Sequence, residues 1–141
     1  MHKRLIKNQR GAALLETAIT LPLILLVSVA IFEFGRAYQT WQVLTNAARE
    51  GARVAIINGT TPEAIKDAVK TYAEVGGLTV TDDQITLDQF KPLGEWTGSE
   101  ITVTYPFDFM VLNPVAKMVA DDSKLGESLA MTAVAVMRNE G

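Results

Sequence analysis

Three residues near the start of the chain have types and spacing that could support a processing reaction. Gly11 precedes the small residue Ala12, and Glu16 follows four residues later inside an apolar run. If a peptidase cuts after Gly11, Ala12 gains an ammonium group that can pair with a carboxylate at helical i, i+4 spacing, on the same chain or on a neighbouring one. The spacing therefore makes Glu16 the candidate partner of the terminus that a cut between Gly11 and Ala12 would create.

The segment that carries Glu16 is long and apolar enough to cross a bilayer. Between Ala12 and Phe34 the only charged residues are Glu16 and Glu33, and as a helix these 23 positions extend roughly 34 Å. A charged side chain inside a spanning helix is costly and by default marks function. The segment is therefore expected to be a membrane helix whose glutamate has a specific role.

The charges on the two sides of this segment differ. Residues 1–11 hold four basic side chains and no acid, whereas Arg36 is the only basic residue between Phe34 and Arg49. The positive-inside rule then predicts a cytoplasmic leader over residues 1–11, a transmembrane helix over residues 12–36 and an exported remainder.

Two simpler interpretations stay open at this point. Glu16 could extend toward the inner headgroups without any partner. The segment could also be an uncleaved signal anchor, which would leave Gly11 and Glu16 as coincidences.

The sequence offers little for catalysis or metal binding. The single histidine, His2, lies in the leader, there is no cysteine, and the serines have no histidine base in the exported part. The pairs Asp82-Asp83 and Asp121-Asp122 lack the spaced oxygen ligands of a calcium loop. We therefore predict no enzyme activity, no metal and no cofactor.

Composition narrows the class of partner. The chain has 141 residues, 48% of them hydrophobic, and a formal net charge of −3. Without residues 1–11 it keeps nine basic against 16 acidic residues, a charge of −7. An acidic exported part argues against a nucleic-acid partner, and without cysteine it has no disulfide.

The motifs resemble those of a known family. The run RGAALLETAITLPLILL, the following EFGRA and the block NAAREGAR at residues 46–53 look like the TadE-like pseudopilins of tight-adherence (Flp) pilus systems. The closing residues 137–140 are also similar, and the resemblance is strongest over residues 10–57. One departure is Thr17, which stands where an aromatic residue commonly follows the motif glutamate.

The resemblance implies a function and a set of partners. It implies cleavage after Gly11 by a prepilin peptidase, retention of the apolar helix in the inner membrane, a periplasmic C-terminal domain and a role in pilus assembly. The implied partners are the peptidase, pilin and sister pseudopilin subunits, and the inner-membrane assembly platform. The alternative is an uncleaved, membrane-anchored periplasmic binding or interaction module, and cleavage at Gly11 distinguishes the two.

The membrane helix is expected to continue into the exported part. Helical periodicity persists over residues 37–59, with an end predicted near Ile57. Ala47, Gly51 and Ala55 form a row of small residues at four-residue spacing, which permits close backbone approach. The row is expected to pack on the protein's own sheet, with a subunit interface as the alternative.

Residues 60–141 are expected to form a small α+β domain. Thr61 and Pro62 predict the start of a second helix, and Gly76-Gly77 its end. Period-two patterns then predict a small antiparallel sheet of three to four strands. The predicted strands lie at residues 78–80, 85–87, 101–105 and 129–137, with the last one central or, alternatively, helical.

The connections between these strands carry their own signals. Asp82-Asp83 predicts a turn, and Pro92, Gly94 and Gly98 predict a long connection. Residues 107–127 are apolar but irregular, and Pro114 could open a short helix there. Their aromatic and aliphatic side chains are expected to cover one end of the sheet, the alternative being a contact surface for a membrane or partner.

Overall fold

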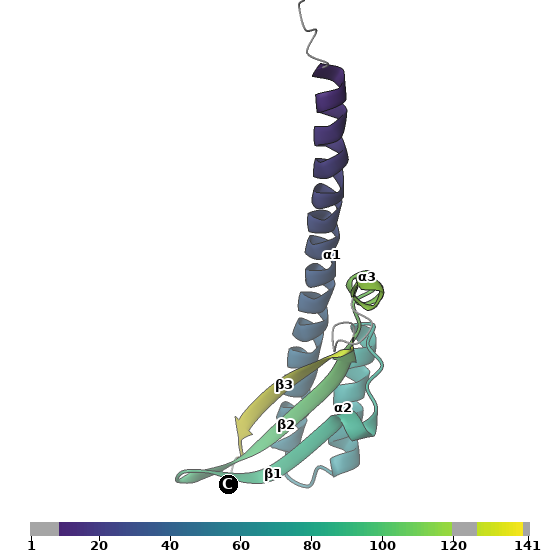
Figure 1. The fold of residues 1–141 in the computed structure, drawn as a ribbon. Helices are drawn as coiled ribbons and strands as arrows, with labels where there is room; N and C mark the ends of the chain where they lie inside the picture. The colour runs from purple at the N-terminus through teal and green to yellow at the C-terminus, as the bar shows by residue number, and fades with distance from the viewer. Residues whose placement is uncertain (1–8, 120–126, 140–141) are drawn as a thin grey trace, which may run out of the picture.

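The computed structural model describes residues 9–119 and 127–139, and shows one long helix with an α+β head on its C-terminal half (Figure 1). In chain order the helices and strands are α1 (Gln9–Ala55), α2 (Pro62–Val75), β1 (Ile85–Leu93), β2 (Trp96–Phe107), α3 (Leu112–Val119) and β3 (Leu129–Arg138). A 3-10 helix, η1 (Asp82–Gln84), precedes β1. The predicted α+β fold is confirmed. Residues 1–8 of the predicted leader and the Asp121-Asp122 pair lie outside the described residues.

Helix α1 runs without interruption from the apolar segment into the head. It has 47 residues, and Pro22 lies inside it without ending it. The helix ends at Ala55, two residues before the predicted end at Ile57. The turn that follows holds Gly59 at φ 81°, a conformation that glycine adopts at no steric cost.

Helix α2 begins and ends where the sequence predicts. The Thr61 hydroxyl accepts a hydrogen bond from the N–H of Ala64 at 3.3 Å, and Pro62 takes the first helical position. At the other end Gly77 has φ 80°, and the N–H of Leu78 donates to the carbonyl of Ala73.

The sheet has three antiparallel strands in the order β1-β2-β3. The predicted strand at residues 78–80 is wrong, because the N–H of Leu78 closes the end of α2 and the segment pairs with no strand in the described part of the chain. The expected central position of the last strand is also wrong, since β2 pairs with both neighbours and β3 lies at an edge.

The apolar composition of β3 has a different explanation from a central position. Met131, Ala133 and Ala135 are buried toward α1, whereas Val134 and Val136 on the opposite face are 52% and 41% exposed. The sequence of β3 is therefore apolar on both faces, although only one face is covered in the fold.

The long connection predicted around Pro92 is instead a tight hairpin. Strands β1 and β2 continue to Leu93 and Trp96, which pair with each other, and Gly94 at φ 74° makes the turn. Pro92 fits in β1 because this is an edge strand, where a missing N–H costs no ladder bond.

A bulge interrupts the hairpin between Asp88 and Lys91. The carbonyl of Gln89 accepts hydrogen bonds from the Asn139 side-chain amide at 2.7 Å and from the Ser99 hydroxyl at 3.0 Å. Ser99 also lies 2.8 Å from Oδ1 of Asn139. These contacts tie the end of the described chain to the bulge.

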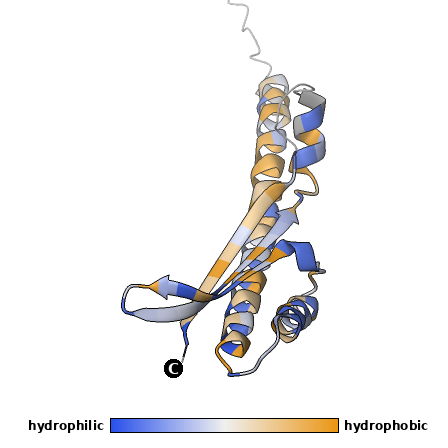
Figure 2. Ribbon diagram, turned by 90° about the horizontal axis from the view of Figure 1, so that it is seen from below, coloured by the Kyte–Doolittle hydropathy of each residue, from blue (hydrophilic) through white to orange (hydrophobic). Residues whose placement is uncertain are grey.

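The core lies where α1 meets α2 and the sheet. Leu44 on α1, Ile65 and Val69 on α2, and Ile101 and Val103 on β2 are fully buried. Figure 2 shows that α2 carries both hydrophilic and hydrophobic residues, consistent with one buried and one solvated side. The C-terminal half of α1 is thus an internal element of the head.

An ion-pair cluster joins α2 to η1. The Lys70 ammonium lies 2.9 Å from a carboxylate oxygen of Asp67 and 2.9 Å from one of Asp82. Hydrogen bonding by Lys70 holds the pKa of Asp82 below its usual value, and these carboxylates raise the pKa of Lys70.

Candidate processing and assembly site

The predicted cleavage residues lie on the first turns of α1, far from the head. Gly11, Ala12 and Glu16 are all exposed, and the helix around them lies apart from the other described elements (Figure 1). Ala12 and Glu16 are separated by one helical turn, so a new terminus at Ala12 would be within reach of the carboxylate on the same helix face.

The helix beyond these residues presents an apolar surface with nothing packed on it. Its large apolar side chains are more than half exposed; they are Leu14, Leu15, Ile19, Leu21, Leu23, Ile24, Leu25, Leu26, Val27, Ile31 and Phe32. The helix is long and apolar enough to cross a membrane, and its apolar window is wholly unburied. This surface points to a membrane anchor or to neighbouring helices, because water is a poor environment for it.

Two polar side chains inside this surface are satisfied by their own helix. The Thr17 hydroxyl donates to the carbonyl of Ala13 and the Ser28 hydroxyl to that of Ile24, each at 2.9 Å. Within the described residues Glu16 makes no such bond. Its carboxylate is a charged, exposed group of this segment that could meet a new amine or a neighbouring chain.

Glu33, the second charge of the apolar segment, lies in a different environment. Its side chain is fully buried by the head. It accepts hydrogen bonds from the backbone N–H of Val111 at 2.6 Å and from Arg36 at 3.0 Å. Glu33 therefore joins α1 to the residues that lead into α3.

The sequence gives only a partial signal for this contact. Arg36 at i+3 is a recognisable ion-pair partner for Glu33. Val111 is 78 residues away, and no local pattern links it to the glutamate.

An aromatic cluster surrounds the Glu33 contact. The guanidinium of Arg36 lies 5.2 Å from the ring centre of Phe107, within cation–π range. The ring of Phe109 packs edge-on against Phe107 and Phe34, with centroid separations of 5.1 and 6.1 Å. Phe107 is buried, as the core interpretation predicts, but Met110 and Val111 are exposed, so the core interpretation holds for only part of residues 107–111.

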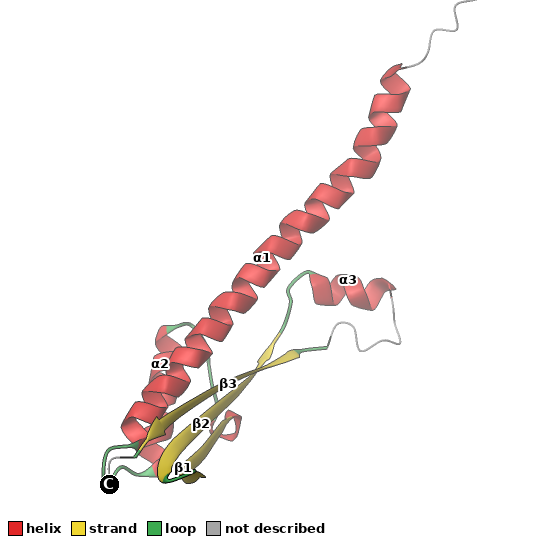
Figure 3. Ribbon diagram, turned by 90° about the vertical axis from the view of Figure 1, so that its left-hand side faces the viewer, coloured by secondary structure: helices red, strands yellow, loops and turns green. Residues whose placement is uncertain are grey.

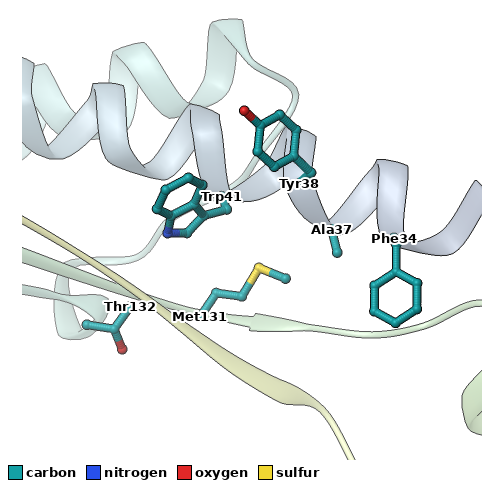
Figure 4. Close-up of a pocket in the computed structure, with 6 residues that line it drawn as sticks. All are labelled: Phe34, Ala37, Tyr38, Trp41, Met131 and Thr132. Carbon is teal, nitrogen blue, oxygen red and sulfur yellow. The ribbon is translucent and has the colours of Figure 1, made fainter. Parts of the chain in front are cut away.

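An open apolar groove of about 590 Å³ lies between α1 and the edge strand β3 (Figure 4). Ala37, Tyr38 and Trp41 line it from α1, and Met131 extends from β3 toward Ala37 and Trp41. Tyr38 and Trp41 are 61% and 44% exposed. The groove holds no group suited to catalysis; its surface fits an apolar or aromatic contact.

The row of small residues lies inside the head. Ala47, Gly51 and Ala55 are buried. A methyl group added at Gly51 would collide with Val69 of α2 and lie 3.4 Å from Ile101 of β2. The close approach at Gly51 is therefore to the chain's own helix and sheet.

These features define an α+β protein with a single N-terminal helix suited to membrane anchoring. The described residues contain no cluster of three metal-ligating side chains.

A comparison with protein families finds a family that part of this chain resembles. The family model described as TadE-like protein matches residues 11–53, which is nearly all of α1 from the expected cleavage point onward. This segment is similar to TadE-like proteins, as its motifs indicate, and the match covers 43 of the 141 residues. The match leaves the sheet and α2 outside. No curated protein and no solved structure matches the chain significantly.

Proposed function

We propose that the chain is a minor pseudopilin that a prepilin peptidase processes and that takes part in assembling tight-adherence pili. The peptidase removes residues 1–11, and α1 then holds the protein in the inner membrane with its N-terminus on the cytoplasmic side and its head in the periplasm. The partners are the peptidase, pilin and sister pseudopilin subunits, and the inner-membrane assembly platform. The role is structural and needs no cofactor.

One observation carries this proposal: an uncovered apolar helix begins with Gly11, Ala12 and an exposed Glu16 that has no hydrogen-bond partner among the described residues, inside the segment that matches the TadE-like family. A helix that served only as an anchor would need neither the small residues at the cut nor a carboxylate one turn later. Processing supplies the amine that this carboxylate can bind.

The contact at Glu33 refines the expected membrane boundary. The sequence suggests a span over residues 12–36, but Glu33 and Arg36 contact the head. We therefore place the spanning part within residues 12–32, a helix of roughly 31 Å, which matches the hydrocarbon thickness of a bilayer. The head then begins directly at the membrane surface.

Intact mass measured on the membrane-extracted chain tests the proposal. The chain is expressed with and without a prepilin peptidase, alongside a Gly11→Ala variant and a Gly35→Ala control on the same helix. Loss of residues 1–11 in the wild type and in Gly35→Ala, only with the peptidase and not in Gly11→Ala, would support pilin-type processing. A full-length mass under every condition would overturn it.

The uncleaved outcome would favour the second function, a membrane-anchored binding or interaction module. The apolar groove between α1 and β3 is the observation that supports such a module. Its exposed Tyr38 and Trp41 would then be the first residues to test for a bound partner.

A further inference from the structure

Two contacts hold the segment that links β2 to α3 at one position along α1. The N–H of Val111 donates to the buried carboxylate of Glu33, and the ring of Phe109 contacts that of Phe34. Glu33 directly follows the exposed apolar surface of residues 12–32. The segment is therefore held at the point where that surface ends.

Apolar side chains of this segment are left uncovered. Met110, Val111 and Val115 are 64%, 42% and 45% exposed. Figure 3 shows α3 standing off the sheet, beside the middle of α1 and away from α2. Ile31 and Phe32, just ahead of Glu33, are 70% and 60% exposed, so the apolar surface of α1 extends along the helix up to Glu33.

We propose that Met110, Val111 and Val115 form a second membrane contact, which inserts into the phospholipid surface on the head side of the bilayer beside α1. This inference rests on the proposed anchoring of α1. It adds a lipid-binding patch within the head, so that the head is seated on the membrane and is not merely tethered to it.

Lipid is favoured as the occupant because of where the patch lies. The apolar surface of α1 requires lipid if the helix spans, and the Glu33 contact keeps the patch next to that surface. Three side chains are too few for a stable protein interface, whereas shallow insertion of a few apolar side chains is sufficient to add to an existing anchor.

One charge near the patch suits a phospholipid surface. Lys117, in the last turn of α3, is exposed and can meet anionic headgroups. Asp108, an acid at the start of the segment, is engaged by the Ser128 hydroxyl at 2.6 Å and by the Asn113 amide at 3.4 Å.

The absence of cysteine from the sequence permits a direct test with single labelled cysteines. Met110→Cys and Val115→Cys carry an environment-sensitive fluorophore in the full chain, reconstituted without other proteins in phosphatidylethanolamine–phosphatidylglycerol vesicles. Phe90→Cys, at a 75% exposed position on β1, is the matched control in the head. Ile19→Cys, 68% exposed on α1, reports on anchoring itself. Nitroxide lipids labelled near the headgroup or deep in the acyl chain are the quenchers.

We expect shallow nitroxides to quench the labels at residues 110 and 115, deep nitroxides to quench the label at residue 19, and neither to quench the label at residue 90. If the label at residue 19 is quenched while those at 110 and 115 behave like the one at 90, the second contact is overturned and anchoring stands. If the label at residue 19 is not quenched, anchoring fails, and this inference fails with it.

Discussion

Two glutamates on α1 stand three residues before an arginine, yet their surroundings give them different roles. Glu50 pairs with Arg53 at the surface, and the guanidinium hydrogen-bonded to it holds the pKa of the Glu50 carboxyl below its usual value. Glu33 pairs with Arg36 but is fully buried and also accepts the N–H of Val111. Surface pairs of this kind contribute little to stability, whereas a buried acceptor leaves its donors unsatisfied when it is removed.

We therefore expect Glu33→Ala to release the β2–α3 connection and Glu50→Ala to leave it in place. Amide hydrogen exchange at Val111, measured on the micelle-embedded protein, should become roughly tenfold faster in Glu33→Ala because its acceptor is lost. The same amide should keep its rate in Glu50→Ala. Equal rates in wild type and Glu33→Ala would show that Glu33 does not hold this connection.

At the scale of the elements, Gly51 sets the distance between α1 and the head. Gly51→Ala forces a methyl group into Val69, and we expect it to lower the free energy of unfolding by about 1–3 kcal/mol. Gly35→Ala is the matched control, because a methyl group there meets nothing within 4 Å and should stabilise the helix by up to about 1 kcal/mol. Denaturant unfolding followed by the fluorescence of Trp41 and Trp96 measures both. A destabilisation of the same size in the two variants would contradict the packing assigned to Gly51.

The bulge in β1 offers a second test at this scale. Ser99 and Asn139 both donate hydrogen bonds to the carbonyl of Gln89. Removing either side chain therefore leaves part of this hydrogen-bond network unpaired. We expect Ser99→Ala and Asn139→Ala each to cost about 1–3 kcal/mol. The double variant should cost clearly less than the sum, because the two changes disrupt one network. Strict additivity in the same unfolding assay would argue that the two side chains act separately.

Some elements could be predicted from the sequence because nearby residues determine them, whereas others depend on contacts between distant parts of the chain. Helix α2 could be predicted because Thr61, Pro62 and the closing glycines act within a few residues. The edge position of β3, the paired strand ends around Gly94 and the unpaired segment at Leu78 depend on which strand pairs with which, and alternation of side chains does not encode this.

The candidate site also has a part that is visible in the sequence and a part that only the fold brings together. Gly11, Ala12 and Glu16 lie within one and a half turns and are visible as a motif, although their roles remain predictions. The contact between Glu33 and Val111 joins distant parts of the chain, and only the fold brings it together.

At the scale of the whole molecule, α1 combines two functions along one axis. Its first half is uncovered and apolar, while its second half is the core of the head. The head is therefore joined to the apolar half of α1 through one continuous helix, and under the proposed function a neighbour that binds this half would also position the head.

We expect Glu16 to act in assembly and not in cleavage. Glu16→Ala should still lose residues 1–11 with the peptidase, but should co-purify with much less pilin subunit from membranes, since the amine of Ala12 loses its carboxylate partner. Thr17→Ala is the control, because the Thr17 hydroxyl is already satisfied by Ala13. Undiminished co-purification of Glu16→Ala would remove the carboxylate from the assembly mechanism.

The identity of the N-terminal residue tests the central claim most directly. N-terminal sequencing of the protein recovered from the membranes of cells that carry the peptidase should begin at Ala12 and continue through Glu16. A sequence that begins at Met1, in cells where the peptidase processes another substrate, would contradict pilin-type processing and leave the uncleaved anchored module in its place.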